Sequence, residues 1–141
     1  MMYALLILNS LIFLLIALLH IYWAFGGTWA IDSAIPTNSD EKKMFSPGIL
    51  GTLTVALGLL FFMLTDLTLV GFITFDIAKN IIHYLVPGIA IIFLIRALGD
   101  FNYVGFTKRH IQSKFAKMDT RFYSPLCLFI ALSHFLAYWI L

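Results

Sequence analysis

The chain has 141 residues, of which 62% are hydrophobic and only 11% are charged, and its mean hydropathy is +0.98. This composition excludes a soluble globular domain and predicts an integral membrane protein, because so short a chain has too little interior to hide its apolar surface from water. The net charge of +2 is too small to indicate a nucleic-acid partner, and the single cysteine, Cys127, excludes an internal disulfide and a multi-cysteine zinc site.

Four stretches are apolar over the roughly 20 residues that a membrane-spanning helix needs. The predicted spans are residues 3–25, about 47–64, about 81–98 and 124–141, within a single transmembrane domain over residues 1–141. The first run is longer than the apolar core of a signal peptide and has no convincing cleavage site, so we interpret it as a retained span. Ser46 and Pro47 form a favourable start for the second helix. The sequence therefore predicts an all-α bundle of four transmembrane helices.

The segments between these spans differ in character. Residues 26–46 contain the polar run "TNSDEKK", whereas residues 65–80 mix apolar and polar positions. The segment 65–80 either extends the second span or lies flat on the membrane surface. Residues 99–123 are rich in lysine and arginine.

Basic residues are distributed unevenly about the four spans. Eight of them fall at the end that carries the first and third loops: Lys42, Lys43, Arg96, Lys108, Arg109, Lys114, Lys117 and Arg121. Only Lys79 and the terminal amine fall at the other end. The positive-inside rule then places these two loops in the cytoplasm and both termini outside it, in a bacterial cytoplasmic membrane.

Polar residues inside the spans follow helical spacing and form stripes. On the first span the stripe is Asn9, Phe13, Ile16, His20 and Trp23; on the fourth it is Ser124, Cys127, Ala131, His134 and Tyr138. The second span offers the small residues Gly51, Thr54 and Gly58, which allow close helix approach. Because polar groups facing lipid are costly, we expect these stripes to face the interior of the bundle.

Two positions at the end of the third span allow two interpretations. Arg96 and Asp100 are four residues apart, so they form an ion pair on one helix face if the helix continues that far. Otherwise Arg96 extends towards the membrane surface and Asp100 caps the chain after the helix.

The segment "HIYWAFGGTWA", residues 20–30, ends the first span. Tryptophans such as Trp23 and Trp29 are typical of the headgroup region, and Gly26 and Gly27 can end a helix in the left-handed conformation. His20 lies about 7–8 Å inside the cytoplasmic end of the span at 1.5 Å per residue. A histidine inside the membrane is a functional candidate, and the alternative is a neutral ring bonded to a neighbouring helix.

Four segments of the chain resemble a known family: "LHIYWAFGGTWA", "IPT", "RALGDFNYVGFTKR" and "FAKMDTRFYSPLC". They are similar to small four-span bacterial integral membrane proteins that share a domain of unknown function. The resemblance covers nearly the whole chain and implies the four-span topology. It brings no activity, cofactor or catalytic residue.

The residues of these four segments converge on the cytoplasmic end of the predicted bundle. There we hypothesise a site that binds or transforms a lipid-soluble small molecule. The candidate catalytic residues are His20, Asp100, Asp119 and Tyr123, and the candidate ligand-binding residues are Trp23, Trp29, Arg96 and Tyr103. The histidine exchanges protons near neutral pH, the acids orient it or act as bases, and Arg96 holds an anionic group. No spacing matches a defined catalytic motif, so the sequence names no reaction and no cofactor.

Three alternatives stay open at this point. His20 and His134 are haem or metal ligands if their axial offset of about 7 Å is bridged by a haem. The chain is one subunit of a homo-oligomeric transporter or channel for ions or small solutes, although no inverted repeat supports this. It is also interpretable as a structural accessory subunit of a larger membrane complex.

Overall fold

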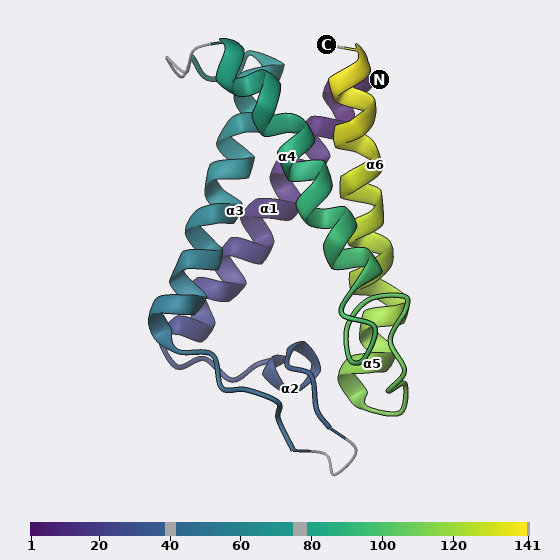
Figure 1. Cartoon of the computed structure of the whole chain (residues 1–141). Helices are drawn as coiled ribbons and strands as arrows, with labels where there is room; N and C mark the ends of the chain where they lie inside the picture. The colour runs from purple at the N-terminus through teal and green to yellow at the C-terminus, as the bar shows by residue number, and fades with distance from the viewer. Residues whose placement is uncertain (39–41, 75–78, 141) are drawn as a thin grey trace.

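The computed structural model describes residues 1–38, 42–74 and 79–140 (Figure 1). The helices in chain order are α1 (Met2–Ala24), α2 (Ile31–Ala34), α3 (Ile49–Val70), α4 (Lys79–Leu98), α5 (Lys114–Met118), the π-helical turn η1 (Asp119–Tyr123) and α6 (Ser124–Ile140). Within the described ranges, β structure is limited to one isolated bridge between Thr37 and Lys43. The expected all-helical fold is confirmed for these residues.

Four helical segments are long and apolar enough to cross a membrane: α1, α3, residues 81–98 of α4, and the continuous run 114–140 that joins α5, η1 and α6. The 22 residues of α3 extend about 33 Å at 1.5 Å per residue. This length matches the roughly 30 Å hydrocarbon core of a bilayer. The chain therefore has the architecture of a multi-pass membrane protein.

Helix α3 is longer than the expected second span. It continues to Val70 rather than ending near Leu64, so the first part of the segment 65–80 extends the span. Gly71 ends the helix with a φ of 85°, and its N–H donates to the carbonyl oxygen of Thr68. Residues 75–78 of this segment, and Leu141 at the end of the expected fourth span, lie outside the described residues.

The helices are arranged as two antiparallel pairs. Helix α1 packs along α3, and α4 packs along α6, with fewer contacts between the pairs (Figure 1). Both ends of the chain lie at one end of the molecule, and the segments 25–38, 42–48 and 99–113 lie at the other (Figure 1). We call these the termini end and the loop end. An even number of crossings produces this arrangement, as the sequence predicts.

An aromatic cluster connects the two pairs. The rings of Phe13, Phe62 and Phe93 lie with centroids 5.5–6.2 Å apart, on α1, α3 and α4. The imidazole of His134 on α6 lies 5.9 Å from Phe13. The predicted inward stripe of α6 is confirmed, because Ser124, Cys127, Ala131 and His134 are buried. On α1 the stripe is buried at Asn9 and Phe13 and only partly buried at His20 and Trp23.

The expected small-residue contact face of the second span is wrong. Gly51 and Thr54 are exposed, and a Cβ added at Gly51 or Gly58 would meet no atom within 4 Å. Helical spacing defines several faces on one helix, and the face that packs here is a different one from that of Gly51, Thr54 and Gly58. The buried residues of α3 are Thr52, Ala56, Leu59, Thr65 and Asp66.

Candidate functional site

The end of α1 is built as the glycine pair predicts. Gly26 has a φ of 91°, and its N–H donates to the carbonyl oxygen of Trp23, while the N–H of Gly27 donates to that of Tyr22. This pair of bonds closes the last turn of the helix. A Cβ at Gly27 would collide with the ring of Tyr22, so glycine is also required there by space.

His20 lies within this helix end rather than facing the acidic candidates. Its Nδ1 is 2.8 Å from the carbonyl oxygen of Ile16, and its ring packs edge-on against Trp23 at 5.1 Å. The indole N–H of Trp23 donates to the backbone oxygen of Trp29, whose side chain is largely exposed. A carbonyl only accepts, so Nδ1 of His20 carries the hydrogen and Nε2 is left as an acceptor.

Residues 99–107 fold back over the C-terminus of α4. The N–H groups of Gly99 and Phe106 donate to the carbonyl oxygens of Ile95 and Ala97, both at 2.8 Å. The hydroxyl of Thr107 donates to the oxygen of Leu98 at 2.6 Å. The last carbonyls of the helix, which have no partner within it, are thereby satisfied.

Asp100 stabilises this returning loop. One of its oxygens accepts hydrogen bonds from the N–H groups of Asn102, Tyr103 and Val104 at 2.7–3.0 Å. Burial alone would raise the pKa of Asp100, but the backbone donors outweigh it and hold the pKa below its ordinary value. The helix ends at Leu98, so the capping interpretation of Asp100 is confirmed and its ion pair with Arg96 is not formed.

Arg96 instead pairs with Asp119, the central residue of a buried charge cluster. The Asp119 carboxylate, which is fully buried, accepts from Arg96 Nη2 at 2.9 Å, Lys108 Nζ at 3.0 Å and the N–H of Gly105 at 2.7 Å. Lys108 also donates to the backbone oxygen of Gly105 at 2.8 Å. We call Arg96, Gly105, Lys108 and Asp119 the Asp119 hub. Both carboxylate oxygens already have donors, so the hub holds loop 99–113 against the helices.

The tyrosine candidates are separate from each other. Tyr103 stacks on His110 with 4.6 Å between the ring centroids, and Tyr123 packs against Phe115. The candidates all lie at the loop end, as expected, but they fall into separate groups rather than one site. These groups are His20 with Trp23 and Trp29, Asp100 and Tyr103 in the loop, and Arg96 with Asp119 and Tyr123 beside η1.

A second polar cluster lies inside the bundle, where sequence reasoning proposed only a haem ligand. The Nε2 of His134 is 3.0 Å from Asp66 Oδ1, and neither side chain is exposed to solvent. The Nδ2 of Asn9 donates to Ser133 Oγ at 2.7 Å and lies 3.4 Å from His134 Nδ1. In the described chain, Asp66 Oδ2 and Asn9 Oδ1 are buried without a hydrogen-bond partner. This cluster connects α1, α3 and α6.

The hydrogen positions in this cluster follow from its acceptors. His134 Nδ1 is 2.8 Å from the carbonyl oxygen of Ile130, which accepts only, and 3.4 Å from the Asn9 amide nitrogen, and the shorter of these contacts favours a hydrogen on Nδ1. The contact of Nε2 with Asp66 Oδ1 then needs one further proton, on the carboxyl or on the imidazole. In either case the pair has no net charge, which its burial requires.

This geometry does not support haem ligation by His20 and His134. Both ring nitrogens of His134 already face partners, Ile130 and Asp66. His134 also lies level with Asn9 and Phe13 on α1, so His20 is 7–11 residues further along, or about 10–16 Å. The sequence-based offset of about 7 Å is too small.

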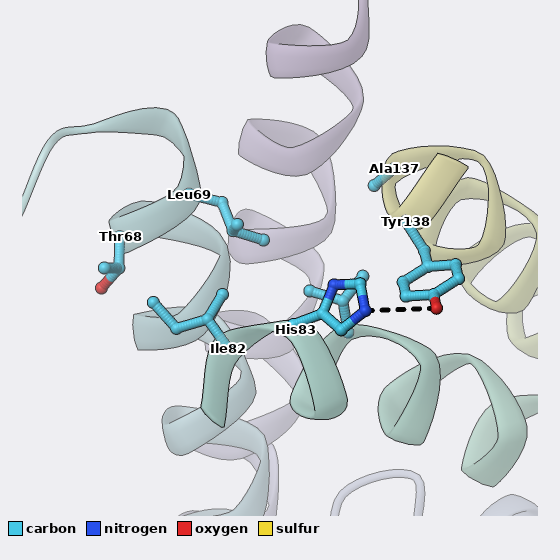
Figure 2. A pocket seen from close by; sticks show the side chains of 7 residues that line it. Thr68, Leu69, Ile82, His83, Ala137 and Tyr138 are labelled. Atoms are coloured by element: carbon cyan, nitrogen blue, oxygen red, sulfur yellow. Dashed lines mark hydrogen bonds between the residues drawn. The ribbon is translucent and has the colours of Figure 1, made fainter. Parts of the chain in front are cut away.

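A pocket of about 320 Å³ opens between α3, α4 and α6 at the termini end. It is lined by Thr68, Leu69, Ile82, His83, Val86, Ala137 and Tyr138. Figure 2 shows the imidazole of His83 and the hydroxyl of Tyr138 next to each other on one side of the pocket, joined by a hydrogen bond of 3.3 Å. The Thr68 hydroxyl is occupied by the backbone oxygen of Leu64. The remaining walls are apolar.

Comparison with family models matches residues 13–134 to DUF3995, a protein family of unknown function. The chain belongs to the DUF3995 family. This finding confirms the resemblance to a family without an assigned activity. Neither the comparison with curated proteins nor the comparison with solved structures found a match. The DUF3995 region includes the Asp119 hub, Asp66 and His134, whereas Asn9 and Tyr138 lie outside it.

Sequence reasoning missed Asp66 because it ended the second span two residues earlier. A usable signal exists in this DUF3995 sequence: the apolar run resumes as "LTLV" after Asp66, which is typical of a helix that continues. A carboxyl group within a span is a functional candidate in its own right. Its pairing with His134 has no counterpart in local sequence, since 68 residues separate the two.

Proposed function

We propose that the protein binds a small lipid-soluble molecule in the pocket between α3, α4 and α6. The observation that carries this proposal is the combination of apolar walls with one polar pair, His83 and Tyr138. Binding sites for small molecules typically combine a mostly apolar lining with a few placed polar groups. The hydrogen bond of this pair is long, at 3.3 Å, so a ligand oxygen or nitrogen can replace it at small cost.

The groups at the loop end are less suited to the same task. The carboxylates of Asp100 and Asp119 accept hydrogen bonds from loop N–H groups and from Arg96 and Lys108. Using either as a base would break contacts that hold loop 99–113. We therefore move the proposed ligand site from the loop end to the termini end.

Native mass spectrometry of the protein in mild detergent tests this function. We expect a discrete non-protein mass that is lost in Ala137→Phe, because the larger side chain fills the pocket. The matched control is Leu136→Phe. Leu136 is next to Ala137 in the sequence, but its side chain is exposed, so this variant should keep the bound mass. An adduct that survives in both variants, or is absent from the natural chain, would contradict the proposal. The same spectrum also gives the number of subunits.

The orientation of the chain follows from charge. We propose that the loop end faces the bacterial cytoplasm, because eight of the nine lysines and arginines belong to it. Both termini then face the outside of the cytoplasmic membrane.

Cysteine labelling in intact cells tests this orientation. In a Cys127→Ala background, a cysteine is placed at Phe72, which is exposed just beyond α3 at the termini end. We expect a membrane-impermeant maleimide to label Phe72→Cys in intact cells. Ile111→Cys, exposed at the loop end, should react only after lysis. The reverse pattern would place the loops outside.

A further inference from the structure

We infer that Asp66 and His134 form a proton site that exchanges its shared proton for a cationic group of a ligand in the pocket. The inference rests on the proposed function and adds the chemical class of the ligand, a small lipid-soluble cation. Its basis is the position of the pair, its proton count and the charges around it.

The pair lies directly below the pocket. On α3, Leu69 of the pocket wall is three residues after Asp66; on α6, Ala137 and Tyr138 are three and four residues after His134. Residues three and four apart share one helix face and lie about one turn from each other. The pocket therefore adjoins the side of the bundle that holds the buried carboxyl.

The pair holds one proton beyond the hydrogen on His134 Nδ1. Removing this proton would leave a lone carboxylate in the membrane interior, and adding another would leave a lone imidazolium. Among the described residues, neither charge has a compensating charged partner in contact with the pair. From α1 the pair faces the neutral Asn9, from α6 the neutral Ser133, and the nearest titratable groups at the pocket are His83 and Tyr138.

A cation in the pocket changes this balance. When it enters, the shared proton leaves to solvent and Asp66 is left as a carboxylate. The one remaining imidazole hydrogen then lies on Nε2, where it donates to Asp66 Oδ1, and Nδ1 faces the Asn9 amide. One positive charge replaces another, so the interior remains neutral. No lysine or arginine is among the described residues that line the pocket, and the ring of Tyr138 offers a face that attracts a cation. Asp66 Oδ2 is buried and without a hydrogen-bond partner in the described chain, and the cation stabilises the negative charge on this oxygen.

The test uses two probes of the same shape, benzyltrimethylammonium and the neutral neopentylbenzene, with calorimetry of the detergent-solubilised protein in two buffers of different ionisation enthalpy. We expect one proton to be released for each benzyltrimethylammonium bound, and the affinity to rise about tenfold per pH unit, as displacement of one proton requires. Neopentylbenzene should bind without releasing a proton.

Variants assign the proton to Asp66. In Asp66→Asn, where the amide N–H can still donate to His134 Nε2, proton release and the pH dependence should disappear. In His110→Gln, which changes a histidine of loop 99–113 that does not line the pocket, both should persist. Release that is absent from the natural chain, unchanged in Asp66→Asn, or lost in His110→Gln would overturn the inference. If the neutral probe binds and Ala137→Phe removes it while the cation releases no proton, the proposed function stands and the proton site falls; if neither probe binds, both fall.

Discussion

Asp119→Asn is expected to lower the free energy of unfolding by about 3 kcal/mol, because removing one partner of a buried ion pair typically costs 3–5 kcal/mol. The amide has the size of the carboxylate but no charge, so Lys108 loses its counter-ion. The Lys108 side chain is only 2% exposed, whereas that of Arg96 is 34% exposed. Most of the cost therefore comes from Lys108, which water cannot reach. Titration of the detergent-solubilised protein with a denaturing detergent measures the change.

The matched control is Asp32→Asn. Asp32 also pairs with a lysine, Lys43, at 2.9 Å, but both side chains are well exposed. Such surface pairs contribute little to stability because water and salt screen them, so this variant should unfold almost as the natural chain does. The double variant Asp119→Asn, Lys108→Met should recover part of the loss. Equal stability of Asp119→Asn and Asp32→Asn would show that the hub does not hold the fold.

Gly105→Ala is expected to destabilise the protein strongly, although less than Gly99→Ala, which changes the other glycine of loop 99–113. Gly105 has a φ of 84°, and a Cβ there would run into the backbone of Leu98 and Gly99. The substitution combines the left-handed penalty of about 1–2 kcal/mol with a collision that separates the loop from α4. Because the N–H of Gly105 also donates to Asp119, the shift weakens the hub. Hydrogen exchange of residues 99–107 should rise together with the loss of stability.

Gly71→Ala separates the two causes. Gly71 has nearly the same φ, 85°, but a Cβ there would meet no atom within 4 Å. It should show only the conformational cost, about 1 kcal/mol. If Gly105→Ala costs no more than Gly71→Ala, close approach of the loop to α4 is not what the glycine provides.

Composition and helical period predict the fold well, because a membrane helix must satisfy its own backbone and be apolar over a fixed length. The end of the second span is the main difference. The sequence places it near Leu64 and leaves open whether residues 65–80 extend it, and the burial of Asp66 against His134 lets the helix continue to Val70. The face with Gly51 and Gly58 was expected to contact another helix and does not. The cause is similar, since the neighbouring helices determine which face of a helix packs.

The site was predictable only as a region. The motif residues Arg96, Gly99, Asp100 and Gly105 do converge at the loop end, but their pattern reflects how a loop returns to its helix. Of these four residues, only Asp100 uses its side chain to form hydrogen bonds within its own segment. Arg96 finds its partner 23 residues away and Lys108 finds the same carboxylate 11 residues away. Spacing along a helix describes one face, and it carries no information on which distant side chain meets that face.

The pairing of Asp66 with His134 also imposes an order on synthesis. His134 leaves the ribosome 68 residues after Asp66, which is about 3–14 s at 5–20 residues per second. During this interval α1 and α3 are already complete, and the carboxyl group has no imidazole beside it. In hydrocarbon a lone carboxyl group is far less costly when neutral. The nascent chain therefore inserts Asp66 as an acid, and the arrival of α6 provides the base that shares its proton.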